Sequence, residues 1–111
     1  MIKSSPPSSV TQPFTSSDKP VFFVDDEQPI RTAVQQTLEL ADFNVECFES
    51  ALSAVPLLTP SWPGVIVSDI NMPDMNGLEL MEKVQEIDPE LPIILVTGHG
   101  DISMAVSAIR N

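Results

Sequence analysis

Hydrophobic and polar residues alternate in blocks along most of the chain, and the blocks predict strands and helices in turn. Short apolar runs bounded by turn residues are typical of buried strands, whereas apolar residues that recur every three or four positions are typical of helices with one buried face. The expected strands cover residues 20–24, 44–48, 65–68 and 93–97, and the expected helices cover residues 28–41, 50–58, 77–88 and 102–110. Strands that alternate with helices imply an α/β fold with a parallel sheet and helices on both of its faces.

Two of these helices have apolar faces that predict core residues. The apolar face of helix 28–41 consists of Ile30, Ala33, Val34, Leu38 and Ala41. In helix 77–88 the residues expected to face inward are Leu78, Met81, Val84 and Ile87. Both sets follow the three-to-four-residue spacing of a buried helix face.

The amino-terminal residues 1–19 are rich in Ser, Pro and Thr and show no hydrophobic periodicity. Such a segment buries too little apolar surface to offset the entropy of ordering, so we expect a disordered tail. The remaining residues 20–111 are expected to form one small domain, which is what a chain of 111 residues has room for.

The composition excludes several classes of protein. The formal charge is −11, from 16 acidic and 5 basic residues, so we expect no direct binding to nucleic acid. No apolar run is long enough to span a bilayer and no signal-peptide pattern follows Met1, which predicts a cytoplasmic protein without a membrane segment. Cys47 is the only cysteine, which excludes an intrachain disulfide, and we expect it to be a small buried hydrophobe.

Polar side chains follow three of the predicted strands. Asp25 and Asp26 follow the first strand, Asp69 follows the third and Thr97 follows the fourth. In open α/β sheets, ligands bind in the crevice outside the carboxyl ends of the strands. Three carboxylates and a hydroxyl at one sheet edge suit a divalent cation together with a phosphoryl group.

The pair Asp25-Asp26 indicates a metal site. Adjacent carboxylates after a buried strand repel each other unless a cation or hydrogen bonds compensate, and Mg²⁺ prefers carboxylate and water oxygens. The alternative is a helix start, with Asp26 as the N-cap and Glu27 favoured by the helix dipole. Helix capping explains the presence of one acidic residue here, but it explains two adjacent acidic residues less well.

Asp69 is a candidate nucleophile, because a carboxylate can attack phosphorus and form an aspartyl phosphate. A nearby cation lowers the repulsion between such a carboxylate and an anionic donor. Thr97 offers a hydroxyl that can donate a hydrogen bond to a phosphoryl oxygen on Asp69. Taken alone, each residue also fits an ordinary strand end, since Thr is common in strands.

Three segments together resemble the receiver domain of two-component response regulators. They are Val24-Asp25-Asp26-Glu27, the segment from Ser68 to Gly77, and Val96-Thr97-Gly98-His99-Gly100-Asp101. The middle segment is the most specific, because Asp, Pro and Gly stand at positions 69, 73 and 77 with the family's spacing. The resemblance covers residues 20–111 and implies the flavodoxin-like, or CheY-like, doubly wound parallel sheet.

The resemblance also implies a set of roles. Asp69 would accept a phosphoryl group from a phosphohistidine on a sensor histidine kinase. Asp26, Asp69 and the backbone carbonyl of Asn71 would ligate Mg²⁺, with Asp25 acting directly or through water, and Thr97 would be the switch hydroxyl. The stretch from 98 to 101 looks like the receivers of transcriptional regulators of the nitrogen-fixation or dicarboxylate-transport type, which implies a transcriptional output outside this chain.

The sequence departs from the family pattern after residue 97. Receivers of this kind have a fifth strand that ends in a Lys contacting the phosphoryl group, whereas this sequence shows four βα units, places Lys83 on an exposed helix face and contains no Tyr. We therefore expect a fragment of a longer regulator or a truncated product, which retains Mg²⁺ binding and is phosphorylated more slowly. Strand 93–97 would be a bare sheet edge that favours homodimer or edge-strand association. The last helix would leave apolar residues partly uncovered, namely Ile102, Val106 and Ile109.

Two other functions are compatible with the same residues. A phosphohydrolase of the haloacid-dehalogenase group would use an Asp nucleophile, but neither strand-end motif has the Asp-x-Asp spacing of that group. An interaction module that keeps the fold without a phosphorylation switch is the second alternative, and the missing Lys favours it.

Overall fold

The computed structural model describes residues 20–97 together with Ser107 and Ile109. The predicted tail 1–19 and most of the predicted helix 102–110 lie outside these residues, as do Ile102 and Val106. Ser107 and Ile109 are helical. Ile109 is buried in the core, so the expectation that it is partly uncovered was wrong.

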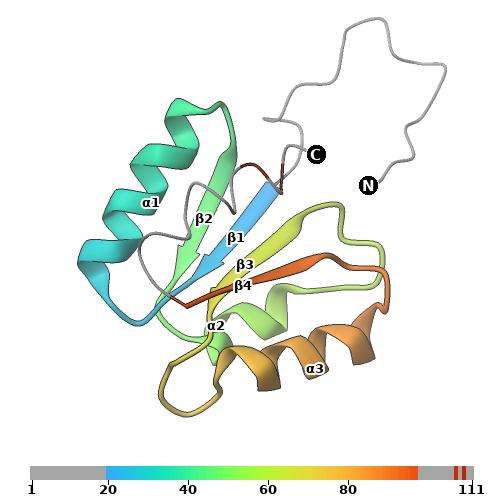
Figure 1. Cartoon of the computed structure of the whole chain (residues 1–111). Coiled ribbons are helices and arrows are strands. Elements are labelled where there is room, and N and C mark those ends of the chain that lie inside the picture. The colour runs from blue at the N-terminus through green and yellow to red at the C-terminus, as the bar shows by residue number, and fades with distance from the viewer. Residues whose placement is uncertain (1–19, 98–106, 108, 110–111) are drawn as a thin grey trace, which may run out of the picture.

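The four predicted strands form one parallel sheet in the order β2-β1-β3-β4 (Figure 1). Their bounds are β1 Pro20–Val24, β2 Asn44–Phe48, β3 Val65–Asp69 and β4 Ile93–Val96. The two central strands, β1 and β3, are buried along almost their whole length because helices cover both faces of the sheet. This order is that of the doubly wound, flavodoxin-like fold. From β1 the chain adds β2 on one side of the sheet, and then adds β3 and β4 on the other side, so the switch point lies between β1 and β3.

The helices lie on opposite faces of the sheet (Figure 1). Helix α1 (Gln28–Leu40) covers one face, and α2 (Ala51–Ala54) and α3 (Gly77–Ile87) cover the other. The predicted helix 50–58 is divided, because α2 passes directly into a 3₁₀ turn, η2 (Val55–Leu57). Pro56 lies in that turn, and a proline has no N–H with which to continue the α-helical hydrogen bonds.

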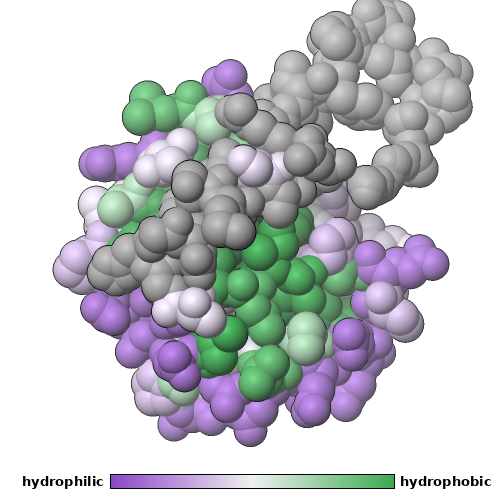
Figure 2. Space-filling model, in the orientation of Figure 1, coloured by the Kyte–Doolittle hydropathy of each residue, from purple (hydrophilic) through white to green (hydrophobic). Residues whose placement is uncertain are grey.

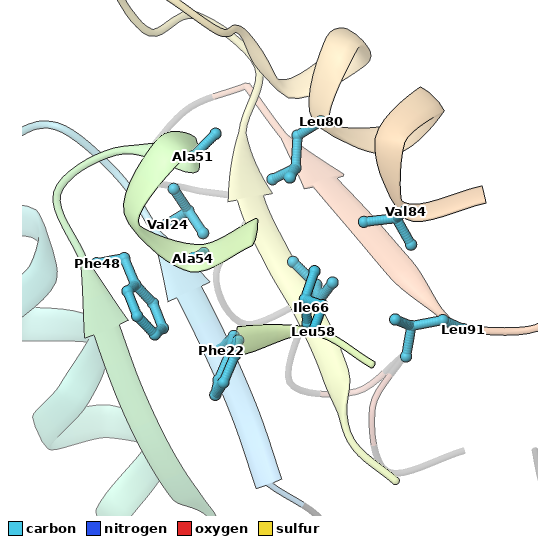
Figure 3. Close-up of a cluster of buried hydrophobic side chains, with 10 residues drawn as sticks. All are labelled: Phe22, Val24, Phe48, Ala51, Ala54, Leu58, Ile66, Leu80, Val84 and Leu91. Atoms are coloured by element: carbon cyan, nitrogen blue, oxygen red, sulfur yellow. The ribbon is translucent and has the colours of Figure 1, made fainter. Parts of the chain in front are cut away.

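Alternate residues of the central strands supply two separate hydrophobic clusters. On the α1 side, Val21 and Phe23 pack with Val34 and Leu38 of the helix. On the other side, residues of β1, β2 and β3 pack against α2, α3 and the loops beside them (Figure 3); the ten buried members of this cluster are Phe22, Val24, Phe48, Ala51, Ala54, Leu58, Ile66, Leu80, Val84 and Leu91. The two-residue period of the strands thus builds one core on each face.

Two predicted core residues are exposed. Leu78 is 50% exposed, and Leu80, which the sequence pattern had not indicated, is fully buried. Helix positions advance by about 100° per residue, so Leu78 lies roughly 160° around the helix from Leu80. Ala33 is also exposed, because it lies at the border of the buried stripe of α1.

Cys47 is half-buried, and its thiol donates a weak hydrogen bond to the Arg31 carbonyl oxygen at 3.8 Å. Burial raises the pKa of this thiol, as expected for a small hydrophobe without a reactive environment.

Within the described part of the chain, β4 hydrogen-bonds to β3 alone and forms one edge of the sheet. Ile93, Ile94 and Leu95 are only partly buried. Figure 2 shows hydrophobic surface over the region where β4 lies, with hydrophilic side chains around it. The helices among the described residues are all too short or too polar to cross a membrane.

Candidate functional site

The predicted acidic residues lie at the carboxyl ends of β1 and β3, which are neighbours in the sheet. The chain leaves β1 toward α1 on one face and leaves β3 toward α3 on the other face (Figure 1). Doubly wound proteins bind their ligands at the strand ends where the chain diverges in this way.

Asp25 is held in place at three of its atoms. Its backbone N–H donates to the Phe48 carbonyl oxygen at 3.1 Å, and its own carbonyl oxygen accepts from Arg31 Nη1 at 2.7 Å. Its Oδ1 accepts from the Glu27 backbone N–H at 2.9 Å. The residue is only 4% exposed, so its carboxylate is a buried and well-positioned group.

The surroundings of Asp25 disfavour its charge. Burial raises the pKa of Asp25, and repulsion from Asp69, Asp26 and Glu27 raises this pKa further, while the hydrogen bond from the Glu27 N–H opposes the shift. A buried carboxylate among other carboxylates is the arrangement that a bound cation stabilises. The repulsion from Asp69 also places the β3 carboxylate within electrostatic reach of the β1 group.

One carboxylate oxygen from each of Asp25, Asp26 and Glu27 lies within 4.8 Å of the other two. Asp26 and Glu27 are exposed, so water has access to the outer side of this cluster. Hard oxygen donors with neighbouring water fit Mg²⁺, which usually keeps several waters and takes one or two carboxylates. Glu27 had been considered only as a helix-dipole residue, and its closeness to the two aspartates depends on the turn between β1 and α1.

The alternative role for Asp26 was wrong. The N-cap of α1 is Glu27, and no side chain makes a capping hydrogen bond there. Helix capping therefore does not account for Asp26.

Asp69 is half-buried at the end of β3. Its Oδ1 lies 3.4 Å from the Asn71 backbone nitrogen, and its carbonyl oxygen accepts from the buried Ser68 hydroxyl at 2.9 Å. Asp69 is opposite Val96 in the ladder between β3 and β4, and the Ile70 N–H donates to the Val96 carbonyl oxygen at 3.0 Å. Thr97 follows Val96 directly, so the structure brings Thr97 to the strand end beside Asp69.

A backbone hydrogen bond connects the two ends of the loop that leads from Asp69 to α3. The Gly77 N–H donates to the Ile70 carbonyl oxygen at 2.8 Å, which ties the start of α3 to the end of β3. At the same place Asn76 and Glu79 form a reciprocal capping box, with two hydrogen bonds of 2.9 Å. The loop therefore keeps Asn71, which is exposed, beside Asp69.

Basic side chains contribute little to the described surface. Lys83 is half-exposed and pairs with Glu86 at 3.5 Å, so it lies on the exposed face of α3 as predicted. Arg31 is the other basic residue among those described, and it contacts Asp25. Arg31 had not been identified from the sequence; the only available signal was an Arg in the first two turns of the helix that follows the acidic segment.

An open hollow lies between α2 and α3. Its walls are mostly acidic, and it is lined by Leu52, Asp74, Met75, Glu79, Glu82, Lys83 and Glu86. Four carboxylates repel a phosphoryl group, and none of the strand-end aspartates lines the hollow. The strand ends that carry Asp25, Asp26 and Asp69 are thus the better candidate for phosphoryl chemistry.

Comparison with known proteins gives a consistent result. The family model described as the response regulator receiver domain matches residues 21–111. The C4-dicarboxylate transport transcriptional regulatory protein DctD of Rhizobium meliloti (strain 1021) is 54% identical over 91 residues, which are 82% of this chain and 20% of that protein. The transcriptional regulatory protein FixJ of the same organism is 37% identical over 94 residues, which are 85% of this chain and 46% of that protein.

Among solved structures, the crystal structure of FixJ-N is similar with a TM-score of 0.63 and 38% sequence identity, covering 84% of this chain and 74% of that chain. A Vibrio cholerae chemotaxis protein, CheY4, is similar with a TM-score of 0.59 and 27% identity, covering 82% of this chain and 79% of that chain. The chain spans about one fifth of the length of the DctD protein that it matches.

Proposed function

Because the chain belongs to the receiver-domain family of two-component response regulators, we propose that it accepts a phosphoryl group on Asp69 from a sensor histidine kinase in a Mg²⁺-dependent reaction. Receiver domains transmit signals and do not turn over metabolites, so the proposed role is that of a phosphoacceptor and switch. The DctD and FixJ relatives are transcriptional regulators, which supports a transcriptional output located outside this chain. A cytoplasmic location is part of the same proposal.

The observation that carries the proposal is the electrostatic state of Asp25. Two backbone hydrogen bonds and one bond to the carboxylate hold Asp25 in a position where Asp69, Asp26 and Glu27 repel its charge. Such an arrangement destabilises the folded protein, because unpaired buried charge lowers the free energy of unfolding. It therefore indicates a function for the carboxylate. Cation binding is the use that its donor atoms fit.

In the proposed reaction, a carboxylate oxygen of Asp69 attacks the phosphorus of a phosphohistidine. The phosphorus–nitrogen bond breaks as the new phosphorus–oxygen bond forms, and the electron pair remains on the imidazole nitrogen. Asp25, Asp26, Asp69 and the backbone carbonyl of Asn71 are the proposed Mg²⁺ ligands, and a bound Mg²⁺ offsets the charge of the three anionic groups and the incoming phosphoryl oxygens. Thr97, one residue beyond the partner of Asp69 in the ladder, supplies a hydroxyl for the phosphoryl oxygens.

Intact-mass spectrometry after incubation with acetyl phosphate and MgCl₂ tests the proposal. We expect the chain to gain one phosphoryl group, and we expect neither Asp69→Asn nor the wild type in EDTA to gain it. Asp74→Asn is the matched control, because Asp74 is an exposed acid on the same loop and its loss should leave uptake unchanged.

Three results would contradict the proposal. Equal phosphorylation of Asp69→Asn would place the acceptor elsewhere. Steady turnover of a phosphomonoester such as p-nitrophenyl phosphate would favour the phosphohydrolase alternative. If Asp69→Asn leaves binding to a partner protein unchanged, the alternative of an interaction module without a phosphorylation switch would be favoured.

A second copy of the chain is the proposed partner of the β4 edge. Leu95 is half-buried there and belongs to neither hydrophobic cluster, so Leu95→Lys adds a charge to the edge at little cost to the core. Sedimentation velocity should show a dimer for the wild type and a monomer for Leu95→Lys. A monomeric wild type at high protein concentration would exclude this association.

A further inference from the structure

We propose that Arg31 is a positioning residue for the Mg²⁺ site, because it holds the turn that carries Asp25, Asp26 and Glu27. The inference rests on the proposed Mg²⁺ site and adds to it a residue outside the set of ligands. Arg31 contacts this turn through its backbone and its side chain, and both contacts are made to backbone carbonyl groups.

Arg31 binds the two ends of the acidic turn. Its Nη1 donates to the Asp25 carbonyl oxygen at 2.7 Å, a short bond of the charge-assisted kind. Its backbone N–H donates to the Glu27 carbonyl oxygen at 3.1 Å. The residue between them, Asp26, is exposed and has little else to fix its backbone, so its position depends on these two ends.

The same arginine is anchored to the neighbouring strand. Its carbonyl oxygen accepts the weak hydrogen bond from the Cys47 thiol of β2. Asp25 is tied to β2 as well, through the bond from its N–H to Phe48. The turn is therefore held against the sheet from both sides, and Arg31 links α1, β2 and the end of β1.

The orientation of the guanidinium leaves the carboxylates available. A cation beside an acidic cluster ordinarily pairs with a carboxylate, yet within the described residues the only ion pair within 4.0 Å is that between Lys83 and Glu86. Arg31 instead donates to a backbone carbonyl oxygen. It stabilises the turn without occupying the oxygens that a metal would use, which is the task of a group that orients metal ligands.

Positioning and simple charge predict effects of opposite sign on Mg²⁺ affinity. If Arg31 acted only as a nearby positive charge, its removal would strengthen Mg²⁺ binding, because like charges repel. If Arg31 orients the turn, its removal weakens binding. A high salt concentration distinguishes these two explanations further. Screening reduces the effect of the Arg31 charge on Mg²⁺ affinity but leaves the effect of positioning.

The experiment is isothermal titration of the full chain with MgCl₂ at low and at high KCl. We expect Arg31→Met, which keeps an apolar stem, to weaken Mg²⁺ affinity by about tenfold at both salt concentrations, as loss of a group that orients metal ligands does. Arg31→Lys restores a donor and the charge, and we expect it to recover most of the affinity. Lys83→Met is the matched control, because it removes one positive charge from an exposed position away from the site.

Circular dichroism checks that each variant is folded, and Arg31→Gln replaces Arg31→Met if the latter is not. Its shorter neutral side chain also loses the bond to Asp25, so the expected weakening is the same. A folded Arg31→Met or Arg31→Gln that binds Mg²⁺ as tightly as the wild type, or more tightly, overturns the inference while the Mg²⁺ site stands. A wild-type chain that binds no Mg²⁺ overturns the site and the inference together.

Discussion

A Cβ atom on Gly77 would lie 2.5 Å from the backbone carbonyl oxygen of Asp69, closer than any ordinary van der Waals contact. It would also lie 2.8 Å from the Ile70 Cα, so both obstructing atoms belong to backbone and not to a side chain that can turn away. Gly77 therefore allows the start of α3 to pack directly against the strand end that carries Asp69, the proposed phosphoacceptor.

Gly77→Ala should both destabilise the protein and disturb Asp69. We expect the free energy of unfolding to fall by about 1–3 kcal/mol, as for an atom forced into a packed region, and phosphoryl uptake from acetyl phosphate to slow. Urea denaturation and intact-mass kinetics measure the two effects. Gln85→Ala, on an exposed position of the same helix, is the control and should change stability by less than about 0.5 kcal/mol. Wild-type stability and kinetics in Gly77→Ala would disprove the packing argument.

Asp25→Asn should stabilise the metal-free protein. The amide keeps an oxygen for the Glu27 N–H and removes a buried charge that three carboxylates repel, so we expect a gain on the order of 1 kcal/mol at pH 7. We expect Mg²⁺ to raise the melting temperature of the wild type, and the same variant should lose this rise. Thermal melts in EDTA and in MgCl₂ test both parts.

Glu46→Gln is the control for Asp25→Asn, since it removes one negative charge from an exposed position on β2. It should keep the stabilisation by Mg²⁺ and change the metal-free stability little. A metal-free Asp25→Asn that is less stable than the wild type would show that the Asp25 charge is not a source of strain.

Asp88 should make stability depend on pH. Its carboxylate accepts hydrogen bonds of 3.0 Å from the Ser61 and Glu90 backbone N–H groups, which hold the pKa of Asp88 below its usual value. Because the folded pKa is lowered, this stabilisation is present above the unfolded pKa of about 3.8 and is lost as pH falls through the folded pKa.

Asp88→Ala is therefore expected to melt at a lower temperature than the wild type at pH 7, and the difference should close in acid. Melting curves across that range measure it, with Glu90→Gln as the control for an exposed carboxylate nearby. A difference that is constant from pH 7 to acid pH would contradict a role for the Asp88 charge.

Leu80 and Leu78 should respond very differently to the same substitution. Leu80 is fully buried between α3 and the sheet, so Leu80→Ala is expected to cost about 3 kcal/mol (Figure 3). Leu78 is half-exposed, and Leu78→Ala should cost less than about 0.5 kcal/mol. Urea denaturation measures the free energy of unfolding of both variants. A larger loss for Leu78→Ala than for Leu80→Ala would mean that α3 packs on its other face.

The sequence predicted the strands more accurately than the helix faces. The strands β1 and β2 have the predicted bounds, because both runs are short and contain the β-branched and aromatic residues that favour strands over helices. The face of α3 was wrong at Leu78, because residues spaced by three drift around a helix of 3.6 residues per turn. The packing of Leu80 and Val84 against the rest of their hydrophobic cluster defines which face is buried.

The candidate site shows a similar division. Asp25, Asp26, Asp69 and Thr97 could be chosen from the sequence, because each follows an apolar run and so lies at a strand end. Arg31 could not, because its bond to the Asp25 carbonyl depends on how α1 leaves the sheet. The proximity of Glu27 to the two aspartates depends on the same turn.

What the sequence by itself determined is local: which residues form strands, and which polar groups follow them. The tertiary structure decided which strand ends are neighbours, since β1 pairs with both β2 and β3 and the order of strands follows from pairings between distant segments. It also decided which carboxylate is buried. Asp25 and Asp26 are adjacent and chemically identical, yet Asp25 is enclosed and Asp26 is exposed, because β2 and Arg31 of α1 bind only the first of them.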